Sequence, residues 1–281
     1  MRRKVGLLHV PKAAGSSLSD ALRRSALDDG LRVAAPAMDH TLFGSFADFG
    51  SLPSSTRQTI ESDPTRLADA DVVLGHYSLA SLRHGRSDND IVCVLREPRA
   101  RLLSLYAFWR SWTAEQHAAW GPYDASRRAV TEQLSGFLQH PALSAQVDNV
   151  AARFLLAGDS RVPTERMIDP ADHDALGTAA LHQLANLGHV DTVEAGDDGW
   201  RRISAWVGAE LVVGNHNVTP PGPVIRTREF EDAAAVIEQS TAIDQRLWLA
   251  VTSAHAPQAS ADRLRALGAA AFDRQRVKVV E

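Results

Sequence analysis

Short apolar runs alternate along the chain with longer stretches in which apolar residues recur at helical spacing. Residues 4–10, 71–75 and 90–95 are apolar at most positions and are short, which is typical of buried strands. A fourth strand is predicted over residues 188–193. Near-continuous apolar runs belong to parallel sheets that are covered on both faces. The pattern therefore predicts an α/β fold with a central parallel sheet flanked by helices.

The helices are predicted from apolar spacing and from the residues that begin and end them. One helix follows Ser16 or Ser17, whose side chain would cap it, and another begins at Pro98, because proline is favoured in the first helical turn. The C-terminal part, residues 229–274, is predicted to be helical with a break near Pro257. In the helix after Pro98, the predicted packed face contains Leu102, Leu105, Tyr106 and Trp109. Other helices are expected over residues 113–158, with breaks near Gly121–Pro122 and Pro141, and over residues 172–187 and 198–207. Residues 30–64 are expected to be irregular with one short helix, and residues 215–223 to form a loop.

Composition and charge narrow the class of protein. The 281 residues contain no internal repeat or linker, so we expect a single α/β domain over residues 1–281. A net charge of −4 excludes a global positive field that would attract nucleic acid. Cys93 is the only cysteine, which excludes an intramolecular disulfide and a thiolate zinc site. Because Cys93 stands in an apolar run, its side chain is expected to be buried.

Apolar stretches of the chain are short compared with the ~20 residues that span a membrane. The N-terminal apolar run is interrupted at Pro11 and Lys12, too early for a signal peptide. We therefore expect a cytoplasmic protein without stable membrane insertion. Lysine is rare in this arginine-rich chain, which makes Lys12 conspicuous.

The segment HVPKAAGSSL, residues 9–18, joins the first predicted strand to the first predicted helix. Unpaired N–H groups and the helix dipole make such a loop a ready anion site. Lys12 would add a point charge, Gly15 would allow close approach of the backbone, and Ser16 and Ser17 would add hydroxyl donors. The order of residues differs from the Walker A motif, in which lysine follows the second glycine. The alternative interpretation is an ordinary turn capped by serine.

A second polar cluster lies in VLREPRARLLSLY, residues 94–106. Arg96 follows a predicted parallel strand, at the edge where open α/β sheets bind ligands, and arginine suits bidentate contact with phosphate. Ser104 lies eight residues further on, in the next helix. The alternative for Arg96 is a surface ion pair with Glu97. Arg99 and Arg101 are expected to be solvated helix residues.

Taken together, the two clusters resemble the sulfotransferases that use 3′-phosphoadenosine 5′-phosphosulfate (PAPS), in the branch that includes the carbohydrate 2-O-sulfotransferases. HVPKAAGSSL resembles the 5′-phosphosulfate loop of that family, and VLREPRARLLSLY resembles its 3′-phosphate motif. Three further segments resemble the family in the same order: VVLGHYS, DNVAARFLLAG and NHNVTP. The resemblance implies a P-loop-like central sheet and, we expect, a bacterial enzyme.

The resemblance also implies roles for individual residues. The loop would hold the 5′-phosphosulfate, and Arg96 and Ser104 would hold the 3′-phosphate. Thr219 would approach the donor from the late loop. The loop residues concerned are Lys12, Ala13, Ala14, Gly15, Ser16 and Ser17. Ala13 and Ala14 stand where the family often has threonine, which removes one hydroxyl.

Sulfuryl transfer needs stabilisation of the leaving oxygen and a base for the acceptor hydroxyl. Lys12 is expected to stabilise the leaving group, and no metal is expected because the transferred group carries a single charge. His76 is the candidate base, since an imidazole pKa near ~6.5 suits proton transfer. Glu97 is the alternative, followed by His9 and His84. The product would be 3′-phosphoadenosine 5′-phosphate (PAP).

The acceptor and the rival functions remain open at this point. A sugar, a glycolipid or a small metabolite would each supply a hydroxyl. Aromatic residues crowd positions 106–123, and we expect core packing there rather than a platform for a sugar ring. A P-loop-like kinase that uses a nucleoside triphosphate is one rival function. A nucleotide-binding protein without catalytic activity is the other.

Overall fold

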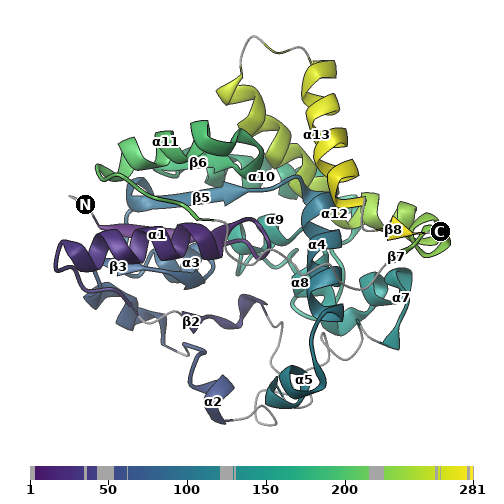
Figure 1. Ribbon diagram of the computed structural model, residues 1–281, viewed down its shortest axis with the longest axis horizontal. Helices are drawn as coiled ribbons and strands as arrows, with labels where there is room; N and C mark the ends of the chain where they lie inside the picture. The colour runs from purple at the N-terminus through teal and green to yellow at the C-terminus, as the bar shows by residue number, and fades with distance from the viewer. Residues whose placement is uncertain are drawn as a thin grey trace.

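A four-stranded parallel sheet forms the centre of the computed structural model, with the strand order β3-β1-β5-β6 (Figure 1). The structure describes residues 4–34, 37–42, 54–61, 63–120, 129, 131–214, 225–256, 259, 261–276 and 279–280. The four strands are β1 (Val5–Leu8), β3 (Val72–Val73), β5 (Ile91–Leu95) and β6 (His189–Thr192). All four were expected from the sequence, and the α/β class with a helix-flanked parallel sheet is confirmed.

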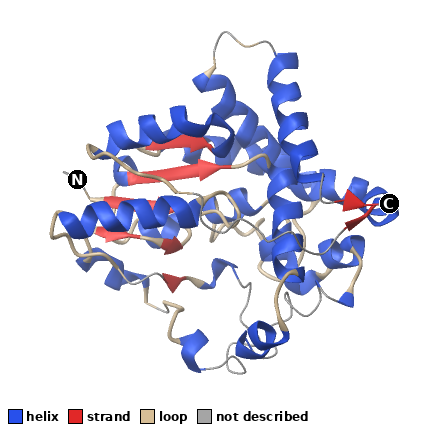
Figure 2. Cartoon of the chain, in the orientation of Figure 1, coloured by secondary structure: helices blue, strands red, loops and turns tan. Residues whose placement is uncertain are grey.

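Helices cover both faces of this sheet, as Figure 2 shows. Side chains that alternate along each strand enter two separate apolar layers, because successive residues of a strand point to opposite faces. One layer lies under α1 (Gly15–Asp28) and α11 (Gly196–Val207). The other layer lies under α3 (Leu79–Leu82), α9 (Val150–Leu155), α10 (His173–Asn186) and α12 (Thr227–His255). Cys93 is buried in this second layer, as predicted.

A third apolar cluster forms beside the sheet around α4 (Pro98–Arg110), the helix that begins at the predicted proline. α4 contacts α12 and α13 (Ala261–Arg276), and α7 (Leu134–Gln139) packs against α12. Tyr106 and Trp109 are buried in this cluster, and Phe108 and Trp112 pack against it, which confirms the expectation of core packing for these four residues. Trp120 ends α5 (Ala114–Trp120), and Tyr123 lies outside the described residues.

The predicted strand 71–75 is split in the structure. β3 ends at Val73, and β4 (Gly75–His76) leaves the main sheet to pair with β2 (Ala37–Met38). Gly75 has a φ of 146°, which side-chain-bearing residues rarely adopt, and this backbone conformation allows the chain to change direction between the two strands. β2 also corrects the prediction that residues 30–64 are irregular.

Shorter elements connect these parts. The C-terminal β8 (Val279–Val280) pairs in parallel with β7 (Ile225–Arg226). The short α-helices are α2 (Ser54–Arg57) and α8 (Ser144–Val147). The 3₁₀ helices are η1 (His40–Leu42), η3 (Pro64–Asp69), η4 (Asp88–Asp90), η5 (Pro141–Leu143), η6 (Pro170–Asp172) and η7 (Val193–Ala195).

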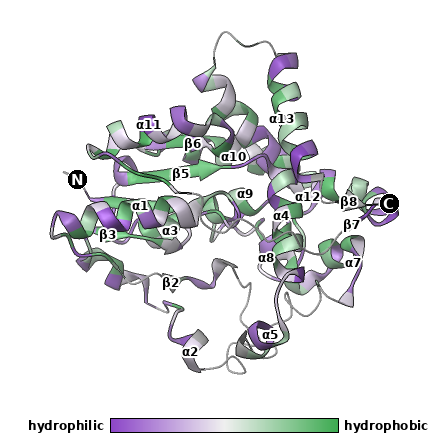
Figure 3. Cartoon of the chain, in the orientation of Figure 1, coloured by the Kyte–Doolittle hydropathy of each residue, from purple (hydrophilic) through white to green (hydrophobic). Residues whose placement is uncertain are grey.

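Hydropathy follows this layering (Figure 3), since the central strands are hydrophobic and the outer helices carry hydrophilic positions. α10 and α11 fall within two residues of their predicted bounds, and the C-terminal part is helical on both sides of the predicted break. Within the described ranges, no helix combines the length and apolar character needed to cross a membrane.

Candidate functional site

The loop between β1 and α1 has an unusual backbone. Lys12 and Ala14 both adopt positive φ values, 67° and 56°, and Ala14 is the residue that precedes α1. Alternation of left-handed and right-handed residues turns successive N–H groups toward one point and forms an anion-binding concavity. Among the described residues, the N–H groups of Ala14, Gly15 and Ser16 have no hydrogen-bond acceptor. The loop therefore has the geometry and the free donors of an anion site.

Helix α1 begins at Gly15, two or three residues earlier than a cap at Ser16 or Ser17 would allow, and no side chain caps it. The prediction that Ser16 or Ser17 is the cap is wrong, because both residues already lie inside the helix. A Cβ atom at position 15 would lie 1.8 Å from Cδ2 of His9, so only glycine fits against the buried imidazole. Close packing on His9 thus fixes where the helix begins and leaves the N–H groups of the loop exposed to a ligand.

His9 and His76 stack beneath the loop, with 4.1 Å between the ring centroids. Nδ1 of His76 lies 2.9 Å from the backbone oxygen of His9. Because a carbonyl oxygen only accepts, the neutral His76 ring carries its proton on Nδ1 and presents Nε2 as an acceptor. Burial lowers the pKa of His76 below its usual 6.5, against smaller opposing effects of the His9 carbonyl and Asp39. A neutral imidazole with a free Nε2 is suited to accept a proton.

Asp39 hydrogen-bonds to the backbone of His76, and the sequence analysis did not identify this residue. Its backbone N–H donates to the carbonyl of His76, 3.1 Å away. Its buried carboxylate accepts hydrogen bonds from the N–H and hydroxyl of Ser78 and from the hydroxyl of Ser81, at 2.7–2.8 Å. This network holds the segment that follows His76 against β2. His84, a weaker candidate base, is exposed just after α3, and its charge acts on Asp63 instead.

Arg96 brings the two predicted clusters together. Its Nη1 donates to the carbonyl oxygen of Lys12 at 3.1 Å, and its Nη2 donates to Oε1 of Gln275 in α13 at 3.2 Å. No carboxylate in the described parts of the chain lies within ion-pair distance of its guanidinium. Burial lowers the pKa of Arg96, with partial compensation from Glu194 and Glu97. A half-buried guanidinium that lacks an ion-pair partner is a candidate anion-binding group.

Glu97 pairs with Arg99 rather than with Arg96, so the alternative interpretation of Arg96, a surface ion pair with Glu97, does not hold. The two Glu97 carboxylate oxygens accept from Nε of Arg99 and from the N–H of Ala100, both at 2.7 Å. Its backbone N–H donates to Glu194, which also accepts from Nε1 of Trp248. Glu97 is fully buried and caps α4, and each of its carboxylate oxygens already accepts a hydrogen bond.

Lys12 makes a second contact, with Phe108 near the end of α4. The ammonium of Lys12 lies 4.2 Å from the centroid of the Phe108 ring, a cation–π contact. Ser104 lies between Arg96 and Phe108 in sequence and is buried, and its hydroxyl forms no hydrogen bond with any residue that the structure describes. The start and the end of one helix therefore fix the position of Lys12, as the two motifs together would require.

Arg101 contradicts the expectation that it is solvated. Its side chain is buried, and burial lowers its pKa to about 10, although Asp244 opposes this shift. Asp244 in α12 accepts hydrogen bonds at 2.9 Å from the N–H groups of Ala151 and Ala152, at the start of α9. Burial raises the pKa of Asp244 to about 6. Asp244 thus joins α12 to α9 by hydrogen bonds, and its charge acts on the buried Arg101 of α4.

The segment DNVAAR, residues 148–153, forms a buried polar network. Asp148 pairs with Arg153 at 2.5 Å and also accepts from the N–H of Ile168 at 2.7 Å. Asn149 has a φ of 44°, and its side-chain oxygen accepts from the N–H of Ile243 at 2.8 Å. This part of the resemblance thus corresponds to contacts that position α9 against α12.

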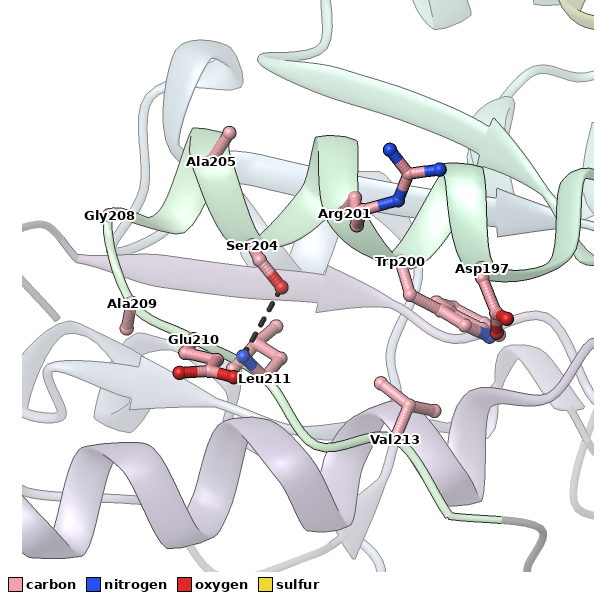
Figure 4. Close-up of a pocket in the computed structure, with 10 residues that line it drawn as sticks. All are labelled: Asp197, Trp200, Arg201, Ser204, Ala205, Gly208, Ala209, Glu210, Leu211 and Val213. Carbon is pink, nitrogen blue, oxygen red and sulfur yellow. Dashed lines mark hydrogen bonds between the residues drawn. The ribbon is translucent and has the colours of Figure 1, made fainter.

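Two cavities lie away from these residues. Figure 4 shows the larger, of about 620 Å³, between α11 and the segment that follows it, where the Leu211 N–H donates to the Ser204 hydroxyl. The smaller, of about 360 Å³, is lined by Tyr77 and by residues of η3. Neither contains a predicted site residue.

The structure thus brings together the loop residues, Arg96 and His76, through direct contacts with Lys12 or His9. Thr219 lies outside the described residues. Comparison of this chain with protein-family models, with curated proteins and with solved structures finds no match.

Proposed function

We propose that the chain is a P-loop-like sulfotransferase that moves a sulfuryl group from PAPS to a hydroxyl of a carbohydrate, a glycolipid or a small molecule. One observation carries the proposal: the guanidinium of Arg96, free of carboxylates within the described residues, contacts a loop in which the N–H groups of Ala14, Gly15 and Ser16 have no acceptor among those residues. Two anion-binding groups held side by side suit a nucleotide with a phosphate at each end of its ribose. The motif order that resembles PAPS-dependent enzymes supplies the identity of that nucleotide.

Each described residue has a distinct role in this mechanism. The N–H groups of Ala14, Gly15 and Ser16 and the ammonium of Lys12 stabilise the charge that grows on the leaving oxygen. Each preorganised donor of this kind lowers the barrier to transfer by about 3–4 kcal/mol. Nε2 of His76 takes the proton from the acceptor hydroxyl, while Nδ1–H stays bound to the His9 carbonyl. The acceptor approaches in line with the leaving oxygen, as in phosphoryl transfer.

Three observations support this assignment of the base. Both carboxylate oxygens of Glu97 have donors of their own. His9 lies against Gly15, and its burial lowers its pKa further than that of His76. His76 alone combines a fixed tautomer with an Nε2 that has no partner among the described groups.

A thermal-shift comparison tests the proposal. PAP is expected to raise the melting temperature, because a ligand at 100 times its Kd stabilises the folded state by about 2.7 kcal/mol. ATP with magnesium is expected to have little effect. Stabilisation by ATP with magnesium alone would point to the kinase function instead. If the chain binds PAP but does not convert PAPS to PAP with any acceptor that is tested, it is a nucleotide-binding protein without catalytic activity.

A further inference from the structure

The C-terminal helix α13 lies against α4 at the end where Arg96 is located (Figure 1). The guanidinium of Arg99 lies 4.7 Å from the centroid of the Phe272 ring, and Phe272 also packs on Phe230 of α12. One helical turn further on, Gln275 reaches Arg96. This packing places the last turn of α13 at the candidate anion site.

The contact between Gln275 and Arg96 leaves a second donor at the site. A guanidinium only donates, so the amide oxygen of Gln275 faces Arg96, and the amide –NH₂ faces elsewhere. Gln275 is buried, and it forms no other hydrogen bond with the residues that the structure describes. The Gln275 oxygen thus occupies a position on Arg96 that a phosphate oxygen would also suit, and its –NH₂ has no acceptor among the residues that the structure describes.

Arg274 adds a second positive charge. It precedes Gln275, and its charge acts on the guanidinium of Arg96 and contributes to the lowered pKa of that group. The two nearest carboxylates, Glu97 and Glu194, are already bound by donors from α4 and Trp248. The Arg96 guanidinium and the Gln275 amide are thus in contact, no carboxylate of the described residues forms an ion pair with Arg96, and the exposed Arg274 next to Gln275 adds a positive charge that acts on Arg96.

We propose that α13 completes the phosphate subsite at Arg96: Gln275 orients the Arg96 guanidinium and donates from its –NH₂, and Arg274 supplies the second positive charge that a dianionic phosphate needs. The inference rests on the proposed function and assigns the 3′-phosphate of the nucleotide to this subsite. Two positive charges and an amide donor favour a terminal phosphate over a singly charged or neutral group. A nucleotide without the 3′-phosphate should then gain no binding free energy from α13.

Binding of two nucleotides tests this assignment. PAP and adenosine 5′-monophosphate differ only in the 3′-phosphate, and their Kd values are measured by calorimetry on the full chain. Arg274→Ala is expected to raise the Kd of PAP about tenfold, or ~1.4 kcal/mol, and to leave the Kd of the monophosphate unchanged. Gln275→Glu, which keeps the size of the side chain, places a carboxylate beside Arg96 and is expected to weaken PAP further. Arg265→Ala removes an exposed charge from the same helix and is the matched control.

The outcomes separate this inference from the proposed function. One outcome is that the wild type prefers PAP over the monophosphate, while the Kd of PAP for Arg274→Ala and Gln275→Glu equals that for the wild type and for Arg265→Ala. In that case α13 has no part in the subsite. If the wild type does not bind PAP, the proposed function itself fails and the inference with it. Melting temperatures of the unliganded variants show that each is folded before its Kd is compared.

Discussion

At the scale of single residues, the loop before α1 holds a conformation that its residues do not prefer. A left-handed conformation costs a residue with a Cβ atom about 1–3 kcal/mol, and Lys12 and Ala14 both adopt one. The surrounding contacts impose it: Gly15 packs on His9, and Arg96 holds the Lys12 carbonyl. The conformation directs the loop N–H groups to a common point, which is the property that an anion site requires.

Gly15→Ala should disrupt this loop. The new methyl group would lie within 1.9 Å of two atoms of the buried His9 ring, so the loop or the ring must move. Overpacking of this kind costs about 1–3 kcal/mol of unfolding free energy, and the displaced N–H groups should no longer bind PAP. Urea denaturation and calorimetry measure the two effects.

Ala14→Gly is the matched change at the adjacent position. Glycine tolerates the left-handed backbone, so this variant should retain PAP binding and keep or raise the unfolding free energy. If both variants behave alike, the close contact between Gly15 and His9 does not determine the loop conformation.

The pKa of His76 predicts the pH dependence of transfer. The base must be neutral, and burial places its pKa below 6.5, so the rate should rise with pH below 6.5 and be level above it. Release of PAP from PAPS, with water as the acceptor, provides the rate. His76→Gln should bind PAP normally and lose both the rate and the acidic inflection. An inflection above pH 7 would assign the proton transfer to another group.

The same burial affects stability. His9 and His76 have lowered pKa values in the folded protein, so the unfolded chain takes up protons first as the pH falls. The unfolding free energy should therefore decrease as the pH falls below about 6.5, the unfolded value of histidine.

At the scale of helices and strands, α4 is the element that joins the site to the core. Arg96 precedes it, Phe108 lies near its end, and both contact Lys12. On the side away from the loop, its Arg101 lies buried near the charge of Asp244, which caps α9. The position of Lys12 thus depends on packing between α4, α9 and α12.

Asp244→Ala should be strongly destabilising. It would leave two buried N–H groups of α9 without an acceptor and would remove a carboxylate whose charge acts on the buried Arg101. Each buried N–H group left without an acceptor costs about 1–3 kcal/mol of unfolding free energy. Asp232→Ala, an exposed aspartate of the same helix, should change the unfolding free energy by less than about 0.5 kcal/mol. Equal effects of the two substitutions in urea denaturation would contradict the role given to Asp244.

The elements that the sequence predicted well are those defined by local pattern. β5 is an unbroken apolar run and lies within one residue of its predicted bounds, and α4 begins at the predicted proline. The serine cap of α1 was wrong because Gly15 packs on His9, a contact between residues of different elements. Arg101 was wrong because α4 is buried on most of its surface, and periodicity assumes one solvated face.

At the scale of the whole molecule, the candidate site depends on contacts across long separations in sequence. Lys12 meets Arg96, and Arg96 meets Gln275 near the end of the chain. The sequence identified Lys12, Arg96 and His76 as separate candidates from their residue types and neighbours. Asp39 and Gln275 had no local motif and were found only when the fold placed them beside those residues.

The central claim is that the loop binds the 5′-phosphate and Arg96 binds the 3′-phosphate of one nucleotide. Calorimetry with PAP and adenosine 5′-monophosphate on wild type, Lys12→Ala and Arg96→Ala tests it directly. Lys12→Ala should weaken both nucleotides, because both carry the 5′-phosphate. Arg96→Ala should raise the Kd of PAP about 10- to 100-fold and leave the Kd of the monophosphate unchanged, since charge-assisted hydrogen bonds contribute about 1.5–3 kcal/mol to binding. An equal loss of both nucleotides in Arg96→Ala, or no loss of either, would contradict the claim.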